Sequence, residues 1–376
     1  MVLITYPNAL KIFLTKRCNL GCRYCFVNKD SPNDKELSVD SFKRGVELFL
    51  AFPGSKKIIS FNGGEPFLRF GKMKRLYGYM QHRINGKVKL AVAVVSNGTL
   101  LNENRYQFLK KNGIILKVSI DGKKGVHDFN RPFKFEKYIS SYDRIIGNLK
   151  RFHNKDGYKI NAQLVFTPFI IKNLSENIQS LWRQGFDYID FYPDLYARWS
   201  KDELDRTERE FRKFVDFYIS IFKNAKDIKD IFENSLLHTF VKELELYKPV
   251  ICQKVHLDRN GYFYCCDKVF SLPESERKEF IIGDIHKGID NRLRLRLLEQ
   301  KRKEIRNLTG NDCRTCKYLK FCFCPVGHYI YFSSYGLDFK KYFPQFCRLS
   351  QIYIQSFLEI KRYLQPRPLF AKVYSN

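Results

Sequence analysis

The sequence predicts an α/β fold in which a parallel sheet and its helices are followed by a smaller, cysteine-rich region. In roughly the first 220 residues, six apolar, β-branched runs alternate with segments of helical spacing. After about residue 235 this alternation stops, and eight of the eleven cysteines follow. Alternating strands and helices are typical of βα units around a parallel sheet, so we assign the sheet to the first region.

The six predicted strands are rich in the β-branched and aromatic residues that favour extended backbone. They are "KIFLT" (11–15), "KIISFNG" (57–63), "KLAVAVVSNG" (89–98), "ILKVSIDG" (115–122), "INAQLVFT" (160–167) and "FDYIDFYPD" (186–194). Helices are predicted between and after them at 38–52, about 70–84, 102–112, 139–153, 174–184 and 203–223, with Ser38 as a candidate N-cap.

Polar or glycine-rich residues follow four of these strands, in the cysteine loop, "NGGEP", "SNGT" and "SIDG". Asn-Gly and Asp-Gly pairs favour turns by themselves, so Asn97 and Asp121 are interpreted as turn residues. Ligands bind at the carboxyl ends of parallel strands. Four such ends, one of them carrying three cysteines, therefore predict a shared site.

The stretch "CNLGCRYC" places Cys18, Cys22 and Cys25 directly after the first strand. A closed structural zinc site needs four ligands, and an iron–sulfur cubane held only by thiolates needs four as well. Three ligands leave one metal position open, and an open position is typical of a site that does chemistry.

Length and charge narrow the class of protein. The 376-residue chain exceeds what one hydrophobic core usually holds, so we expect two domains, residues 1–235 and 236–376. We recognise no signal peptide and no membrane-spanning run, so we expect a cytoplasmic protein with reduced thiols. The formal net charge of +28 is spread along the chain, which favours a solvated basic surface over a nucleic-acid-binding arm.

The first region resembles the radical S-adenosylmethionine (SAM) enzymes. Cys18-x3-Cys22-x2-Cys25, with Tyr24 before the last cysteine, resembles their signature loop, and "GGEP" (63–66) resembles their motif after the second strand. "VSIDGKKGVHDFNR" (118–131) resembles the fourth-strand region of the members that modify peptides and proteins, such as the anaerobic sulfatase-maturating enzymes. The resemblance implies a partial (βα)6 TIM-like barrel for this region.

The last third resembles the SPASM domain, a small cysteine-rich domain that holds auxiliary iron–sulfur clusters. The matching residues are Cys252, Gly261, Cys266, Cys313, Cys316, Cys322, Cys324 and Cys347. The family's interleaved pattern gives one cluster Cys313, Cys316, Cys322 and Cys347, and the other Cys252, Cys266 and Cys324, with Cys265 as candidate fourth ligand. Structural zinc remains the alternative. Cys265 and Cys266 would point to opposite faces of a strand, so one of them is a candidate free thiol.

The resemblance also implies the chemistry of the open position. Three thiolates would hold three irons of a [4Fe–4S] cluster, and SAM would bind the fourth. Reductive cleavage of SAM would then give methionine and a 5′-deoxyadenosyl radical, which takes a hydrogen atom from the substrate. The cofactor carries this chemistry, and the protein supplies binding and orientation.

Six residues are implied in SAM binding: Tyr24, Gly63, Gly64, Glu65, Ser119 and Arg131. The glycines would let the backbone approach the methionyl amine, which Glu65 would accept; a simple Gly-Gly turn is the alternative. Tyr24 would pack on the adenine or serve as a core aromatic. Ser119 would bind the ribose or carboxylate side of SAM, and Arg131 would bind the carboxylate, which a bidentate guanidinium suits.

The expected function is that of an enzyme that oxidatively modifies a ribosomally made peptide or a protein side chain, by a crosslink, a thioether or a formylglycine. Asp267, directly after Cys266, is the candidate base by resemblance, with a hydrogen bond to the cluster loop as the alternative. We expect three [4Fe–4S] clusters, a reductant such as flavodoxin or ferredoxin, and a substrate with an acidic segment. A radical SAM enzyme acting on RNA and a non-catalytic iron–sulfur or zinc protein are the competing hypotheses.

The ligand count predicts about twelve irons per anaerobically reconstituted chain, four for each of three clusters. Changing Cys18, Cys22 and Cys25 together to Ala should remove about a third of this iron, because only the first cluster loses its ligands. Iron analysis of both proteins measures the difference. Equal iron in the two would contradict the assignment of the loop.

Overall fold

The computed structural model describes residues 5–27, 36–84, 88–136, 138–152, 157–186, 188–224, 252–310, 315–318, 325–334 and 337–364. The expected domain boundary after residue 235 falls outside these ranges, and so do Cys313, Cys322 and Cys324. The division into two domains therefore stays a prediction.

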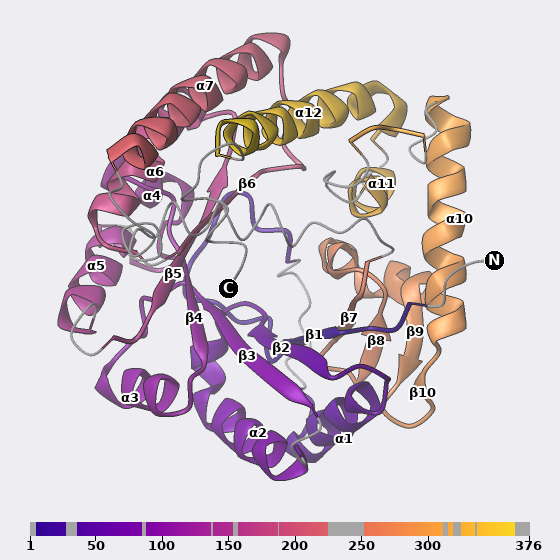
Figure 1. The fold of residues 1–376 in the computed structure, drawn as a ribbon. Coiled ribbons are helices and arrows are strands. Elements are labelled where there is room, and N and C mark those ends of the chain that lie inside the picture. Colours follow the sequence, from indigo (N-terminus) through magenta and orange to yellow (C-terminus); the bar gives the residue numbers. More distant parts are fainter. Residues whose placement is uncertain are drawn as a thin grey trace.

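The six predicted strands are all present and pair in parallel, each with its neighbour in the chain (Figure 1). They are β1 (Ala9–Phe13), β2 (Lys56–Asn62), β3 (Lys89–Ser96), β4 (Ile115–Ser119), β5 (Ile160–Phe166) and β6 (Tyr188–Pro193). The α/β partial barrel expected from the sequence is thus confirmed.

The six predicted helices are also present and lie outside the curved sheet (Figure 1). They are α1 (Val39–Leu50), α2 (Phe70–Arg83), α3 (Glu103–Lys111), α5 (Ser141–Phe152), α6 (Leu174–Arg183) and α7 (Lys201–Asn224). Ser38 caps α1 as predicted, because its hydroxyl accepts a hydrogen bond from the Ser41 N–H. A short helix that the sequence analysis did not foresee, α4 (Lys124–Asn130), follows β4, and one-turn 3-10 helices lie at η1 (Pro66–Arg69) and η2 (Ile171–Asn173).

Strand register separates an apolar outer face from a mixed inner face that carries polar and charged residues. Residues side by side in neighbouring parallel strands point the same way, and successive residues alternate. The outer face holds fully buried residues such as Leu10, Ile59 and Val94, which pack under the helices. The inner face holds Lys11 and its register partner Ser60, both part-exposed. Polar and charged side chains therefore face the interior of the barrel.

The last third of the chain continues the same sheet. Strand β7 (Lys254–Leu257) pairs in parallel with β1. Strands β8 (Tyr262–Tyr264), β9 (Ile281–Asp284) and β10 (Gly288–Ile289) follow as antiparallel neighbours. The ten strands run in the order β10-β9-β8-β7-β1-β2-β3-β4-β5-β6, so the barrel stays open between β6 and β10. The 3-10 segments η3 (Asp267–Ser271) and η4 (Glu274–Phe280) connect β8 to β9.

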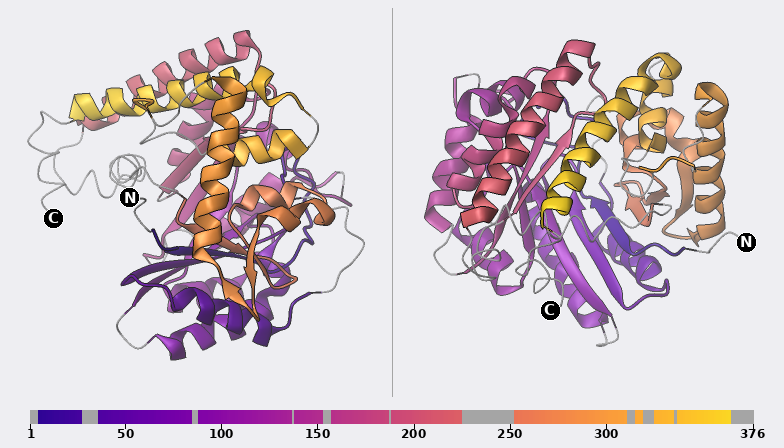
Figure 2. Two further views of the ribbon diagram at one scale, coloured as in Figure 1. Left: turned by 90° about the vertical axis from the view of Figure 1, so that its right-hand side faces the viewer. Right: turned by 45° about the horizontal axis from the view of Figure 1, so that its top comes forward.

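Three helices complete the described fold: α10 (Asn291–Thr309), α11 (Pro325–Ser334) and α12 (Phe339–Leu364). Helix α12 lies along α7 (Figure 2), and its Tyr353 and Phe357 contact Phe191 of β6. The last third therefore meets the sheet at both edges, through β7 beside β1 and through α12 beside β6. No helix in the described ranges is both long enough and apolar enough to cross a bilayer.

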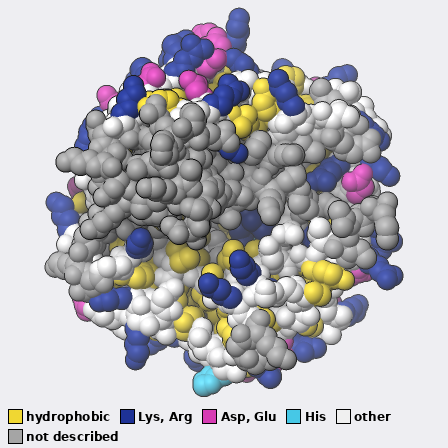
Figure 3. Space-filling view, in the orientation of Figure 1, with side chains coloured by type: hydrophobic (Ala, Val, Ile, Leu, Met, Phe, Trp, Pro, Cys, Tyr) yellow, Lys and Arg dark blue, Asp and Glu magenta, His cyan; other side chains and the backbone are white. Residues whose placement is uncertain are grey.

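Lysine and arginine side chains are scattered over the face seen in Figure 3, and acidic side chains are fewer there. This view agrees with the even spread of basic residues along the sequence.

Candidate active site

The cysteine loop that follows β1 is held against the segment after α4. Leu20 forms an isolated antiparallel bridge with Phe133, and the Gly21 and Arg23 N–H groups donate to the carbonyls of Pro132 and Asn130 at 2.8 and 2.9 Å. Cys18, Cys22 and Cys25 lie on this loop, half-buried or exposed. The backbone contacts fix the path of the loop on which all three thiols lie.

Gly63 and Gly64 allow a close approach between two strand ends. Gly63 has a φ of +135°, and the Gly64 N–H donates to the Thr15 carbonyl at 2.7 Å. A Cβ on Gly64 would lie 2.1 Å from the carbonyl oxygen of Arg17, just before the first cysteine. The glycines thus bring the end of β2 against the start of the cysteine loop. Their predicted contact with the methionyl amine stays a prediction.

Glu65 joins the ends of β2 and β3 through a buried carboxylate. Its side chain is fully buried and accepts hydrogen bonds from the Phe67 N–H at 3.0 Å, the Ser96 hydroxyl at 2.8 Å and the Asn97 N–H at 2.8 Å. Burial raises the pKa of Glu65 to about 7, although these donors favour the ionised form. The structure gives this side chain a positioning role; the predicted acceptance of the SAM amine stays a prediction.

Asn97 connects this strand end to the first cysteine. Its side-chain oxygen accepts from the Thr99 N–H, as its interpretation as a turn residue requires. Its amide nitrogen lies 2.8 Å from the Asn19 side-chain oxygen and 3.7 Å from the Cys18 sulfur. The "NGGEP" and "SNGT" ends therefore meet at the cysteine loop, as expected for a shared site.

Asp121, interpreted from the sequence as a turn residue, has a larger role. It is fully buried and binds Arg131 through both carboxylate oxygens at 3.0 Å, while the Tyr24 hydroxyl donates to it at 2.6 Å. The Arg131 guanidinium also lies over the Tyr24 ring, 5.1 Å from its centroid. Burial would lower the pKa of Arg131, but this carboxylate outweighs it and raises the pKa. Spacing along the sequence gave no signal of this convergence.

Ser119 and Asp267 reach the inner face of the sheet from different elements. Ser119 ends β4 and sits beside Gln163 of β5. The Asp267 carboxylate, at the start of η3, lies 2.5 Å from the Lys11 ammonium of β1. Burial would raise the pKa of Asp267, but the Lys11 and Lys268 ammonium groups outweigh it and hold the pKa well below its usual range. Asp267 is thus held as an ion-paired carboxylate, and its role as a base stays a prediction.

The auxiliary cysteines that the structure describes fall into different surroundings. Arg294 of α10 donates to the Cys252 carbonyl and interacts electrostatically with both Cys252 and Cys265. Cys266 instead lies beside α11, where a Cβ on Gly327 would come 3.4 Å from its sulfur. Cys265 and Cys266 follow β8 outside its strand and have different neighbours, and which of them is a ligand stays a prediction. Cys347 is half-buried on α12 and Cys316 is exposed.

The donor set of the first loop fits an iron–sulfur cluster. Cys18 and Cys25 are close enough to Cys22 to act electrostatically on its thiol, and burial raises the pKa of Cys22 to about 12. Within the described ranges, no three His, Cys, Asp or Glu side chains are grouped as ligands of one metal ion would be. Each thiolate of a cubane binds a different iron, so its ligands need not converge on a single ion.

Residues 12–177 match the family model of the radical SAM superfamily. The chain is also 32% identical over 207 residues to an uncharacterised protein of Methanocaldococcus jannaschii, covering 54% of this chain and 68% of that one. The chain belongs to the radical SAM superfamily. The cofactors of this superfamily are SAM and a [4Fe–4S] cluster, and Cys18, Cys22 and Cys25 stay the predicted ligands of that cluster.

Two further similarities extend over most of this radical SAM protein. A cysteine-type anaerobic sulfatase-maturating enzyme of Clostridium perfringens is 23% identical over 325 residues, covering 81% of this chain and 84% of the enzyme. The solved structure of hexahistidine-tagged anSMEcpe with bound AdoMet superposes with a TM-score of 0.66 at 20% identity, covering 94% of this chain and 99% of that one. The structural likeness establishes a common fold.

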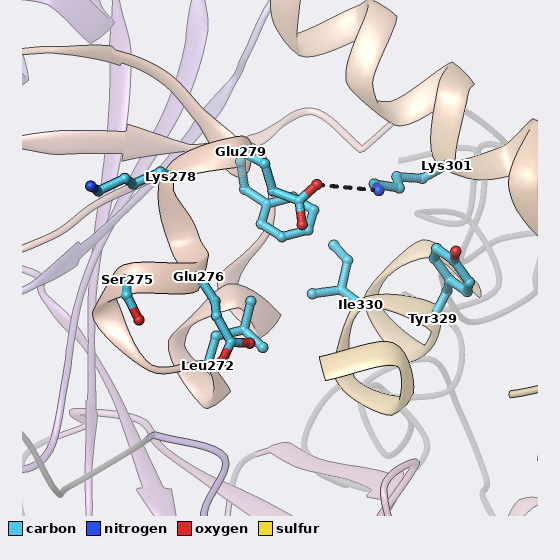
Figure 4. Close-up of a pocket in the computed structure, with 9 residues that line it drawn as sticks. Leu272, Ser275, Glu276, Lys278, Glu279, Lys301, Tyr329 and Ile330 are labelled. Atoms are coloured by element: carbon cyan, nitrogen blue, oxygen red, sulfur yellow. Dashed lines mark hydrogen bonds and ion pairs between the residues drawn. The ribbon is translucent and has the colours of Figure 1, made fainter. Parts of the chain in front are cut away.

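A cavity of about 420 Å³ lies at a different place in this radical SAM protein, between η4, α10 and α11 (Figure 4). Its lining includes Leu272, Phe280 and Ile330, with Lys301 facing Glu279 across it at 3.5 Å. None of the site residues predicted from the sequence lines it. The cavity therefore belongs to the packing between η4 and these helices.

The close approach at Gly64 predicts that Gly64→Ala lowers the thermal unfolding midpoint and the iron content, because the new Cβ meets backbone atoms that cannot move aside. Gly78→Ala in α2 is the control, since nothing lies within 4 Å of its Cβ. That change should stabilise the helix by about 1 kcal/mol and keep all the iron. A Gly64→Ala protein with normal iron and midpoint would contradict the packing argument.

Removing the Asp121 carboxylate should destabilise the protein strongly, because it leaves the buried Arg131 charge without its partner. We expect a loss of about 3–5 kcal/mol for Asp121→Ala. Asp143→Ala, at an exposed ion pair with Lys124, should cost about 1 kcal/mol or less. Restoration of part of the loss in the Asp121→Ala/Arg131→Ala double variant, measured by thermal unfolding, identifies the pair as the cause. Equal losses in the Asp121 and Asp143 variants would contradict this assignment.

Proposed function

We propose that this radical SAM protein uses a cluster on Cys18, Cys22 and Cys25 to oxidise a side chain of a ribosomally made peptide or of a protein. The observation that carries the proposal is the arrangement of the cysteine loop. Backbone contacts hold it against the ends of β2 and α4, and Asn97 extends from the end of β3 to Cys18. When bound, the cluster and SAM supply a 5′-deoxyadenosyl radical able to take a hydrogen atom from an unactivated carbon.

The chain's own residues would then bind, orient and shield the reactants. In the proposal Arg131, fixed by Asp121, faces the carboxylate of SAM, and Tyr24 packs near its adenine. Ser119 lies on the inner face at the end of β4, where it would meet the ribose or carboxylate side of SAM. Gly63, Gly64 and Glu65 would set the position of the methionyl end. These roles extend the family resemblance residue by residue.

The peptide or protein substrate is supported by the similarity to the clostridial sulfatase-maturating enzyme over 81% of this chain. The bond formed, whether crosslink, thioether or formylglycine, is left open in the proposal. Each requires a two-electron oxidation: one electron leaves with the hydrogen atom, and the other needs an acceptor.

The cysteines after residue 252 are the proposed acceptors of that second electron. In the proposal two auxiliary [4Fe–4S] clusters use Cys313, Cys316, Cys322 and Cys347, and Cys252, Cys266 and Cys324 with Cys265 as candidate fourth ligand. A flavodoxin or ferredoxin would reduce the first cluster, in a cytoplasmic setting that keeps all these thiols reduced. The common surroundings of Cys252 and Cys265 near Arg294 support Cys265 as a ligand.

The test is anaerobic incubation of the reconstituted protein with SAM and dithionite. We expect 5′-deoxyadenosine and methionine from the wild type and neither from the Cys18→Ala/Cys22→Ala/Cys25→Ala variant. Cys347→Ala is the matched control, because it removes a thiol from a proposed auxiliary cluster and should leave SAM cleavage in place. Cleavage that persists in the triple variant would overturn the proposal.

A further inference from the structure

Lysines gather on the inner face of the sheet. From β1 to β7, the strand register places five of them there: Lys11, Lys56, Lys89, Lys117 and Lys254. Only one acidic residue of these strands, Asp190, shares that face. A charged residue within a strand of a parallel sheet is unusual, because such strands are mostly apolar.

The lysines in the middle of the sheet form ion pairs with acidic side chains, whereas, within the described ranges, those at one end of the strands do not. Lys11 pairs with Asp267 at 2.5 Å, and Lys117 pairs with Asp190 at 2.6 Å. Lys56, Lys89 and Lys254 are exposed and have no ion pair among the described residues. Lys254 nevertheless interacts electrostatically with Lys11, Cys252 and Asp267, so Lys56 and Lys89 carry the more isolated charges. Each of the three lysines is the first residue of its strand, so the unmatched charge lies at the amino-terminal mouth of the barrel.

This placement is locally unfavourable. Lys56 and Lys89 are register partners on neighbouring strands, where like charges repel. Lys254 is register partner of Ala9 on β1, so it lies two strand spacings, roughly 10 Å, from the β2 strand. Unfavourable local arrangements, such as like charges on neighbouring strands, occur most often at functional sites.

A further feature of the inner face suits a peptide. Ile58 and Ile115 on the same face are 49% and 39% exposed, so apolar surface lies among the lysines. The mouth therefore offers cations and apolar contacts together.

We propose that Lys56, Lys89 and Lys254 bind the carboxylates of an acidic segment of the peptide substrate. This rests on the proposed function, which supplies the peptide. An acidic segment would relieve the repulsion between the lysines, and its apolar residues would cover Ile58 and Ile115. Strand β1 is 5 residues long, so the mouth and the cysteine loop are separated by at least roughly 16 Å. An extended peptide spans this distance with about five residues, which sets the minimum spacing between the acidic segment and the modified residue.

Fluorescence anisotropy with defined probes tests the site. The probes are a twelve-residue peptide carrying four glutamates, its glutamine counterpart and a twelve-nucleotide RNA. We expect the wild-type protein to prefer the acidic peptide, and the Lys56→Met/Lys89→Met/Lys254→Met variant to bind it about tenfold more weakly. The control variant, Lys150→Met/Lys201→Met/Lys303→Met, changes three exposed helix lysines. It loses the same charge from the +28 total and should bind normally.

The outcomes distinguish binding at these three lysines from non-specific attraction by the net charge of the protein. Equal weakening in both triple variants, or equal binding of the two peptides, overturns the proposal. Selective loss of RNA binding in the mouth variant overturns the assignment to a peptide. Formation of 5′-deoxyadenosine by the mouth variant tests the proposed function independently, since these lysines lie at the opposite end of the strands from the loop that carries Cys18, Cys22 and Cys25.

Discussion

The alternation of side chains along parallel strands in register is the constraint on which the rest of this structure depends. Residues of one parity on β1 to β7 point outward and are apolar and buried, as Leu10, Ile59 and Leu116 are. Residues of the other parity point into an open barrel and include the polar and charged side chains of these strands, such as Lys11, Ser60 and Lys117. A shift of one residue in any strand would exchange the two faces, so the hydrophobic effect that fixes the register also fixes which side chains face the interior.

Two buried carboxylates join the strand ends, and they differ in the groups that bind them. Glu65 is surrounded by neutral donors, and burial raises its pKa to about 7. Asp121 is equally buried but binds the Arg131 guanidinium through both oxygens. Both link elements that are distant in sequence, since Glu65 reaches Ser96 and Asn97, and Asp121 reaches Tyr24 and Arg131. Burying polar groups is costly unless every one is bonded, and such networks hold a single geometry when they are complete.

The last third of the chain shares its sheet and its core with the first. Strand β7 lies beside β1. Because Gly45 of α1 has no side chain, Leu257 of β7 can pack closely against it; a Cβ at position 45 would lie 2.4 Å from the Leu257 side chain. At the other edge, Tyr353 and Phe357 of α12 pack on Phe191 of β6. Among the described cysteines of this region, Cys252, Cys265 and Cys347 thus lie on or beside elements that pack against the barrel.

The sequence by itself determined the six barrel strands and the six helices predicted with them, and it predicted the first metal loop. Periodicity placed all six barrel strands and their helices, because apolar burial requires these patterns, and the spacing of Cys18, Cys22 and Cys25 predicted an open metal position. Only the tertiary structure decided what the strand-end residues contact. The Asp121–Arg131 pair, the approach of Gly64 to Arg17 and the pairing of Lys11 with Asp267 all join residues that are not neighbours in the chain. Such contacts depend on the relative placement of whole strands, whereas a local pattern reports only which face of its own element a residue occupies.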